Sequence, residues 1–219
     1  MYGIIIAEKL ELEVGMMSRK LKINLILSTA AMLLPALAGL ILWNRLPDSV
    51  PIHWNAFGEV DGYGSKLFIV AGLPALFLLF HIIVTLSLVI VSKKSEGSNN
   101  SGLAVTMWLM PIIVILTSAF VYCAGLNIPI DANLFFPVVV CLIFTISGFI
   151  LLRYPNLKAI NFPTKSISTR RFSGIVLMVC SIISAVLSFF KLYYIIIPIA
   201  FLCVVVPTIY HFTKGRYIG

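Results

Sequence analysis

Long apolar runs separated by short polar gaps dominate this chain. Six stretches contain no Lys, Arg, Asp or Glu, namely 23–44, 67–92, 102–130, 132–152, 172–190 and 192–213. A helix of about 20 residues crosses a hydrocarbon core roughly 30 Å thick, so each stretch is long enough to span a membrane. Because backbone polar groups in lipid must be satisfied within the segment, the runs predict helices. We therefore expect an all-α integral membrane protein with six transmembrane helices.

Composition supports this expectation and excludes a soluble domain. Hydrophobic residues make up 60% of the 219 residues and charged residues only 11%, whereas soluble domains carry about 25% charged residues. A soluble fold of this length could not cover so much apolar surface with so few charges. The cysteines all fall within or at the edge of apolar runs without metal-ligand spacing, which favours packing roles for Cys123, Cys141, Cys180 and Cys203.

The distribution of basic residues predicts the topology. The net charge is +8, but the charges lie in the gaps between apolar runs and form no patch, so we expect no direct nucleic-acid contact. With a cytoplasmic N-terminus, the inner segments hold 13 Lys and Arg and the outer segments hold 3. Because cytoplasmic loops of membrane proteins are enriched in these residues, both termini are expected in the cytoplasm of a bacterial cell, with the helices in its cytoplasmic membrane and membrane lipid as a partner.

Four segments follow from this topology. The expected order is a cytoplasmic N-terminal segment, an N-terminal domain of two helices and one outer loop, a four-helix C-terminal membrane region and a short cytoplasmic tail. Their predicted bounds are 1–22, 23–92, 102–213 and 214–219, and the outer loop of the N-terminal domain is 45–66.

The outer loop 45–66, RLPDSVPIHWNAFGEVDGYGSK, is the most informative segment. Its prolines restrict φ and stiffen the chain after the first helix. The pairs of turn-forming residues at Phe57–Gly58 and Asp61–Gly64 predict tight turns. Aromatic residues in and beside the loop favour headgroup depth, so we expect the loop to fold back onto the membrane surface.

Three interpretations of the loop stay open. It is a structured cap whose polar groups satisfy one another, a recognition surface for an external ligand, or a metal or acid–base site made from His53, Glu59 and Asp61. The third lacks the repeated His spacing of HExxH-type sites. We expect no metal and no cofactor. Because no GxSxG, HExxH, GxGxxG or P-loop motif and no intramembrane carboxylate pair occurs in the sequence, we also expect no enzymatic activity.

The ordered pattern Leu46-Pro47-Asp48…Pro51-x-His53-Trp54-Asn55-x-x-Gly58-x-x-Asp61-Gly62-Tyr63-Gly64-Ser65-Lys66 resembles the N-terminal domain of the SdpI-like bacterial membrane immunity proteins. A weaker likeness to the family's second signature lies between Gly148 and Gly174, where the family's Trp residues and its Gly-Ile-Arg core are missing. The resemblance implies six helices and immunity against a secreted antimicrobial peptide, with signalling to a cytoplasmic transcriptional regulator.

The resemblance also implies which outer-loop residues bind the peptide. Prolines and glycines would shape the loop, His53, Asn55 and Asp61 would supply polar contacts, and Lys66 would anchor the loop at the second helix. The expected ligand-binding residues are Pro47, Pro51, His53, Trp54, Asn55, Gly58, Asp61, Gly64 and Lys66.

An intramembrane histidine suggests an alternative function. His81 lies near the midpoint of the 67–92 run, and ionisable groups at that depth are functional candidates. A structural hydrogen bond is the competing interpretation, because no charged residue lies within any run. The alternative function is a small-solute permease or an accessory subunit of a transporter.

The cytoplasmic loop 153–171 carries five basic residues and no acidic one. Contact with anionic lipid accounts for such a loop at about 1 kcal/mol per basic residue. The functional hypothesis is docking of an acidic regulator. The candidate partner-docking residues are Arg153, Lys158, Lys165, Arg170 and Arg171.

Overall fold

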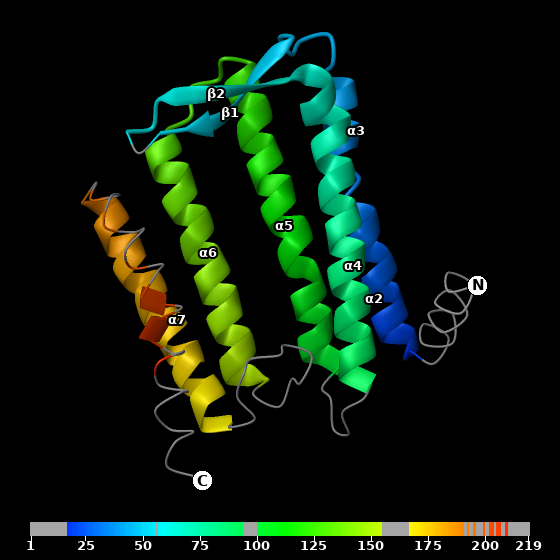
Figure 1. Ribbon diagram of the computed structural model, residues 1–219, viewed down its shortest axis with the longest axis vertical. Helices are drawn as coiled ribbons and strands as arrows, with labels where there is room; N and C mark the ends of the chain where they lie inside the picture. The colour runs from blue at the N-terminus through cyan, green and yellow to red at the C-terminus, as the bar shows by residue number, and fades with distance from the viewer. Residues whose placement is uncertain are drawn as a thin grey trace.

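The computed structural model describes residues 17–55, 57–93, 100–154 and 167–190, together with positions 192, 195, 199, 202, 203, 205, 206 and 209. Long helices and one β-hairpin make up the described chain (Figure 1). The helices are α2 Arg19–Ala31, α3 Leu34–Ile41, the π-helical turn η1 Phe68–Gly72, α4 Leu73–Lys93, α5 Asn100–Gly125, α6 Ala132–Arg153 and α7 Ile167–Phe189; the strands are β1 Ser49–Trp54 and β2 Val60–Ser65.

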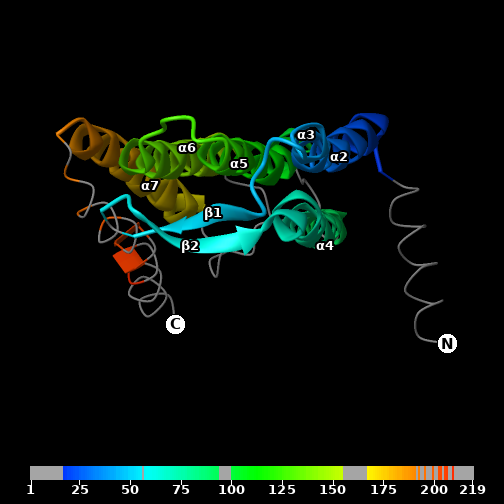
Figure 2. The ribbon, with the colours of Figure 1, turned by 90° about the horizontal axis from the view of Figure 1, so that it is seen from above.

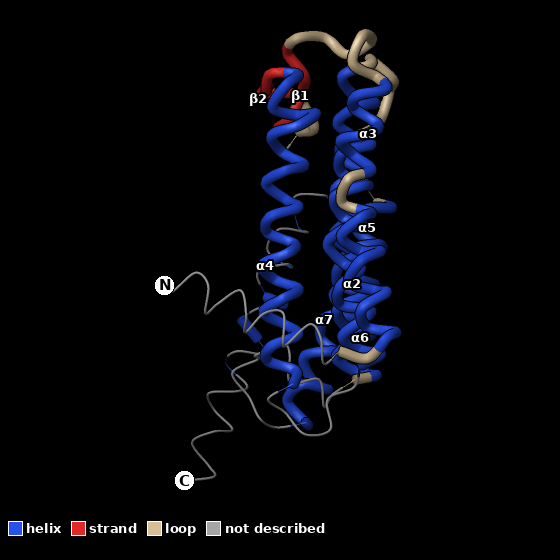
Figure 3. Tube along the Cα trace, turned by 90° about the vertical axis from the view of Figure 1, so that its right-hand side faces the viewer, coloured by secondary structure: helices blue, strands red, loops and turns tan. Residues whose placement is uncertain are grey.

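The helices form one curved layer with α4 placed on one of its faces. Seen along the helices, α7, α6, α5 and the α2–α3 segment follow one another in a row, and α4 lies beside the α3 and α5 end of that row (Figure 2). The hairpin crosses the ends of α5 and α6 on the face that α4 occupies. A side view places the hairpin at one end of the molecule (Figure 3). We call this end the hairpin end.

Five helical segments of the described chain are long and apolar enough to cross a membrane. They are Arg19–Ile41, Phe68–Ile90, Gly102–Gly125, Ala132–Arg153 and Arg170–Ser188. The predicted sixth span, 192–213, lies outside the described residues except for isolated positions. The prediction of an all-α chain is wrong in one respect, because the predicted outer loop contains a two-stranded antiparallel sheet.

Proline explains why the first two predicted helices are not continuous. The first begins at Arg19, four residues earlier than predicted, and is interrupted between α2 and α3, immediately before Pro35. In the second, the π turn η1 precedes Pro74. Proline has no N–H and its ring clashes with the carbonyl four residues back, which disfavours a regular α-helical turn at these two positions. Pro111 and Pro137, in contrast, lie within the uninterrupted helices α5 and α6.

A turn and a helix N-cap connect α5 to α6. The α5 helix ends at Gly125, before the end of the charge-free run 102–130, and Asn127 follows with a φ of 57°. Asp131 is the N-cap of α6, and its carboxylate accepts a hydrogen bond from the backbone N–H of Asn133 at 2.9 Å. A carboxylate at this position satisfies a free N–H and faces the positive end of the helix dipole.

Two glycines bring α6 and α7 into backbone contact. The α7 helix begins at Ile167, five residues earlier than predicted. A Cβ atom on Gly148 would lie 2.9 Å from the carbonyl oxygen of Gly174, and a Cβ atom on Gly174 would lie 3.0 Å from that of Gly148. Small residues permit this close approach, which is how helices associate where lipid offers no hydrophobic driving force.

Two buried clusters hold the ends of the bundle. The cluster at the end opposite the hairpin contains Met17, Leu21, Val89, Leu103, Met107 and Ile150. The cluster at the hairpin end contains Leu46, Val50, Ile69, Val70 and Tyr122. Because the second cluster combines residues from β1, η1 and α5, it fixes the hairpin to the helices.

A buried tyrosine links α5 to the break in the first helix. The Tyr122 hydroxyl donates a 2.7 Å hydrogen bond to the carbonyl of Pro35. A Cβ atom on Gly39 would lie 2.6 Å from that hydroxyl, so glycine is needed for the approach of α3.

We expect Tyr122→Phe to destabilise the protein by about 1 kcal/mol, since the hydrogen bond between the Tyr122 hydroxyl and the Pro35 carbonyl is lost. Thermal unfolding of the purified protein in detergent measures the shift. Tyr63→Phe, on the exposed side of the hairpin, is the matched control and should leave the melting temperature unchanged. An equal melting temperature for Tyr122→Phe and wild type would contradict the assigned hydrogen bond.

Candidate functional site: the hairpin and the cavity beneath it

The hairpin is formed by the segment that the sequence singles out. Strands β1 and β2 pair from Ser49 with Ser65 to Trp54 with Val60. The predicted turn at Phe57–Gly58 lies at the hairpin tip, where Gly58 adopts a φ of 81°. The predicted turn at Asp61–Gly64 is wrong, because these residues lie within β2. Their glycines instead give room to β1, since a Cβ atom on Gly62 would lie 2.8 Å from the Cβ atom of His53.

Side chains of two asparagines fix the hairpin tip. The Oδ1 atom of Asn55 accepts hydrogen bonds from the backbone N–H groups of Phe57 and Glu59 at 2.9 and 3.0 Å. Its Nδ2 atom donates to the Glu59 carboxylate at 2.9 Å. From the first turn of α6, Asn133 donates a 2.9 Å hydrogen bond to the carbonyl of Phe57. The tip is therefore attached to a helix far away in the sequence.

His53 and Asp61 form a pair on the exposed side of the hairpin. The Nδ1 atom of His53 lies 2.5 Å from a carboxylate oxygen of Asp61, and the two side chains are 71% and 44% exposed. Because Glu59 bonds to Asn55, the three residues of the metal-site hypothesis do not converge. Among the residues that the structure describes, no group of three or more His, Cys, Asp or Glu could hold a metal ion.

Lys66 closes the base of the hairpin. Its ammonium donates to the carbonyl of Leu46 at 3.1 Å and forms an ion pair with Asp48 at 3.0 Å. It also lies 5.2 Å from the ring centre of Trp43, within range of a cation–π contact. These contacts join the end of the first helical segment to the start of the second.

An aromatic cluster supports the hairpin at the end of β1 next to the tip. Trp54 lies 4.8 Å from Phe120 and 5.7 Å from Phe136, measured between ring centres. Phe135 stacks on the other side of Phe120 at 4.2 Å. Since these rings come from β1, α5 and α6, the cluster joins the hairpin to two transmembrane helices.

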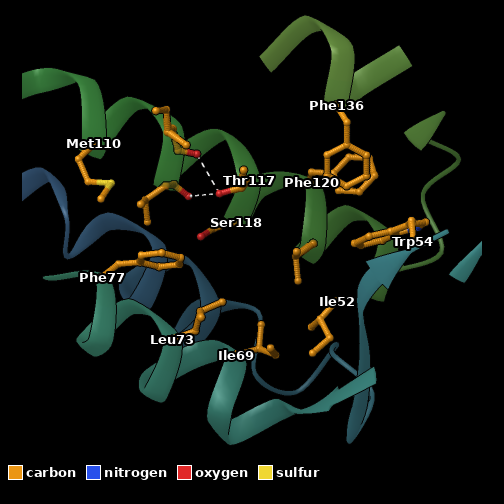
Figure 4. Close-up of a pocket in the computed structure, with 13 residues that line it drawn as sticks. Ile52, Trp54, Ile69, Leu73, Phe77, Met110, Thr117, Ser118, Phe120 and Phe136 are labelled. Atoms are coloured by element: carbon orange, nitrogen blue, oxygen red, sulfur yellow. Dashed lines mark hydrogen bonds between the residues drawn. The ribbon is translucent and has the colours of Figure 1, made fainter. Parts of the chain in front are cut away.

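A cavity of about 290 Å³ opens beneath this cluster (Figure 4). Residues from β1, η1, α4, α5 and α6 form its walls. They are Ile52, Trp54, Ile69, Leu73, Phe77, Met110, Ile113, Val114, Thr117, Ser118, Phe120, Val121 and Phe136. Its walls are mostly apolar, with the hydroxyl-bearing Thr117 and Ser118 on the α5 side.

The predicted ligand-binding residues are brought together on one hairpin, but they do not all face the same way. His53, Asp61 and Pro47 are exposed, whereas Trp54 faces the helices and lines the cavity. Pro51 and Gly64 lie within the paired strands. Sequence reasoning missed the cavity walls on α5 and α6, because their apolar residues are indistinguishable from lipid-facing ones without the packing.

His81 lies in a buried polar contact between α2 and α4. It is 1% exposed, and its Nε2 atom lies 3.3 Å from the Ser28 hydroxyl. The Ser28 hydroxyl also lies within hydrogen-bond distance of the carbonyl of Leu25, at 3.1 Å. One turn away, Trp108 of α5 donates to Asn24 of α2 at 2.9 Å. Both contacts hold α2 in place.

The predicted partner-docking residues are only partly described. Lys158 and Lys165 lie outside the described residues. Arg153 and Arg171 are exposed, but Arg170 lies in the first turns of α7 and is only 9% exposed. The predicted docking loop is therefore shorter than 153–171, because α7 begins at Ile167.

The two ends of the molecule differ in charge. Among the residues that the structure describes, the hairpin end carries four acidic residues, Asp48, Glu59, Asp61 and Asp131, and two basic residues, Arg45 and Lys66, so the formal net charge of these described residues is −2. Where the structure describes the opposite end, it carries basic residues alone, namely Arg19, Lys20, Lys22, Lys93, Arg153, Arg170 and Arg171.

These features define a multi-pass cell-membrane protein with a structured hairpin at one end of its helices. The family described as domain of unknown function DUF1648 matches residues 30–78, from the end of α2 through the hairpin into α4. The chain is 27% identical over 200 residues to the immunity protein SdpI of Bacillus subtilis (strain 168), which covers 86% of this chain and 95% of the relative. No solved structure matches. Together the two similarities support an SdpI-like family.

Proposed function

We propose that this protein is a membrane immunity protein that protects its cell from a secreted, cationic and amphipathic antimicrobial peptide. The similarity to immunity protein SdpI over most of the chain is the observation that carries the proposal. In the proposed topology the hairpin end faces outward and both termini lie in the cytoplasm. The basic opposite end favours this orientation, because positive residues are enriched on the cytoplasmic side.

The chemistry of the hairpin supports a cationic ligand. The described residues at its end of the molecule have a net charge of −2, in a chain whose net charge is +8. Asp61 is exposed beside His53, and Glu59 lies at the tip. The acidic groups lie above an apolar cavity, so they can attract the basic face of an amphipathic peptide while the cavity accepts its apolar face. Electrostatic complementarity of this kind speeds the encounter with an oppositely charged partner.

Signalling to a cytoplasmic regulator and solute transport stay predictions. Exposed Arg153 and Arg171 fit an acidic partner as well as anionic lipid. For transport, the enclosed position of His81 and its bond to Ser28 favour a structural role over a permeation path.

Expression in a peptide-sensitive bacterium tests the immunity proposal. We expect the wild-type protein to raise the peptide concentration that stops growth, and His53→Ala or Asp61→Ala to lower that tolerance several-fold, because the exposed polar pair on the hairpin is lost. The challenge peptides are the small secreted peptides encoded next to the gene, made synthetically. Immunoblots of membrane fractions check that the variants are present at the wild-type level.

Ser49→Ala provides the matched control, since Ser49 is exposed at the other end of the same strand, where it pairs with Ser65. It should retain wild-type tolerance. Unchanged tolerance on expression of the wild-type protein, across all of the neighbouring peptides, would contradict the immunity proposal.

A further inference from the structure

The cavity beneath the hairpin is large enough for a ring system. Apolar cavities of about 150 Å³ remain dry and bind benzene, and this one measures about 290 Å³. Phe77 and Met110 lie at one end of it and Trp54 and Phe136 at the other (Figure 4). The space therefore suits one bicyclic or phenyl side chain.

Two hydroxyl groups of the α5 wall, those of Thr117 and Ser118, belong to neighbouring residues. The Thr117 hydroxyl donates its one proton to the backbone of its own helix, within range of the carbonyls of Ile113 and Val114. Within the described part of the chain, the Ser118 hydroxyl has no such partner, and it points into the cavity (Figure 4). A hydroxyl oxygen can accept a hydrogen bond from an indole N–H.

The depth of the cavity suits a ligand that lies in the membrane interface. Its lining on α5 runs from Met110 to Val121, which corresponds to about 16 Å at the rise of an α-helix. The cavity thus begins directly below the hairpin and covers about half of a hydrocarbon core roughly 30 Å thick. Amphipathic peptides lie in the interface with their apolar face buried about 5–10 Å deep.

The acidic residues of the hairpin favour a cationic peptide over an anionic lipid as the ligand that places an apolar group in the cavity. The acidic residues Glu59 and Asp61 lie on the hairpin that covers the cavity. An anionic lipid would be repelled by this end of the molecule, whereas lysine or arginine side chains of a peptide would be attracted.

We propose that this cavity receives one aromatic side chain, an indole or a phenyl ring, of a cationic amphipathic peptide whose basic residues contact the hairpin. The inference rests on the proposed immunity function, and it names the chemistry by which that ligand is recognised. Trp54, Phe120 and Phe136 surround the entering ring, and Ser118 accepts the hydrogen bond of an indole.

Binding of synthetic peptides to the full chain in lipid nanodiscs tests the proposal. The probes are three amphipathic lysine–leucine peptides that differ at one central position on the apolar face, which is Trp, Leu or Ala. We expect the Trp peptide to bind at least about tenfold more tightly than the Ala peptide, once binding to empty nanodiscs of the same lipid is subtracted.

Filling the cavity should remove this preference. Ser118→Phe places a ring in the space that the ligand ring would occupy, so the Trp and Ala peptides should bind equally. Ala119→Phe adds the same ring at the next position, which is exposed on the helix surface, and should keep the preference. As a second variant, Ser118→Cys is folded first and then modified with a benzyl thiosulfonate, with wild-type protein treated in the same way as its control.

Each outcome decides the matter. Loss of the preference in Ser118→Phe or in benzylated Ser118→Cys, with retention in Ala119→Phe, supports the aromatic site. The proposal is overturned if the wild-type protein prefers the Trp peptide over the Ala peptide no more than empty nanodiscs do, or if the preference survives in both Ser118→Phe and benzylated Ser118→Cys. Lipid is then the occupant of the cavity. If expression gives no immunity while the preference for the Trp peptide in nanodiscs holds, the proposed function fails and the aromatic site remains. If immunity persists in Ser118→Phe, the proposed function remains and the aromatic site fails.

Discussion

Gly148→Val is expected to force α6 and α7 apart and to lower the melting temperature by about 6–12 °C. The first added carbon would already lie 2.9 Å from the carbonyl oxygen of Gly174, and backbone cannot move aside as a flexible side chain can. Overpacking of this kind costs about 3 kcal/mol, which corresponds to that temperature shift in a chain of this size. Thermal unfolding of the purified protein in detergent measures it.

Phe149→Val provides the control at the next position, because Phe149 is exposed on the helix surface. It should unfold within a few degrees of wild type. Gly174→Val should resemble Gly148→Val, since the two glycines face each other across the contact. A melting temperature for Gly148→Val equal to that of Phe149→Val would mean that the two helices do not meet at this point.

Trp54→Ala is expected to release the hairpin from the helices, and with it to abolish the proposed immunity, while the protein stays in the membrane. The indole is in contact range of Phe120 and Phe136, and removing a buried tryptophan costs about 3–5 kcal/mol. Because Trp54 is only half-buried, we expect about 2 kcal/mol. Chymotrypsin cleavage of the hairpin in nanodiscs should then be at least about tenfold faster, since cleavage follows the opened population.

Tyr63→Ala removes an aromatic side chain from the other strand, where it is exposed. It should not accelerate cleavage at the remaining sites of the hairpin. Trp54→Phe keeps a ring in the cluster and should fall between wild type and Trp54→Ala. Equal cleavage rates for Trp54→Ala and wild type would show that the aromatic cluster does not hold the hairpin.

The hydrophobic pattern was sufficient to predict the spans but not their internal breaks. Each of the five described spans overlaps a charge-free run, because the bilayer sets the length of a crossing helix. Two helices begin earlier than the charge-free runs predict, at Arg19 and Ile167, because basic residues readily occupy the first turn of a helix and a charge-free run excludes them. The α2–α3 break and η1 depend on local proline geometry that a residue count does not capture.

The hairpin shows a different limit. Gly62 and Gly64 have low strand propensity and resemble turn residues, yet they pair with β1 because their missing side chains leave room for His53 and Ile52. The sequence therefore singled out the segment that forms the hairpin but predicted the wrong local structure for Asp61–Gly64, and ligand binding by this segment stays a prediction. The apolar half of the candidate site, on α5 and α6, required the packing of helices distant in sequence.

The contact between Asn133 and the hairpin tip has a consequence for biogenesis. Phe57 precedes Asn133 by 76 residues, and synthesis at about 5–20 residues per second would take roughly 4–15 s to cover that interval. During this time the tip would lack its α6 partner and Trp54 would lack Phe120 and Phe136. The docked hairpin is thus a late product of insertion, and it would form only in molecules whose third and fourth crossing segments have already assembled.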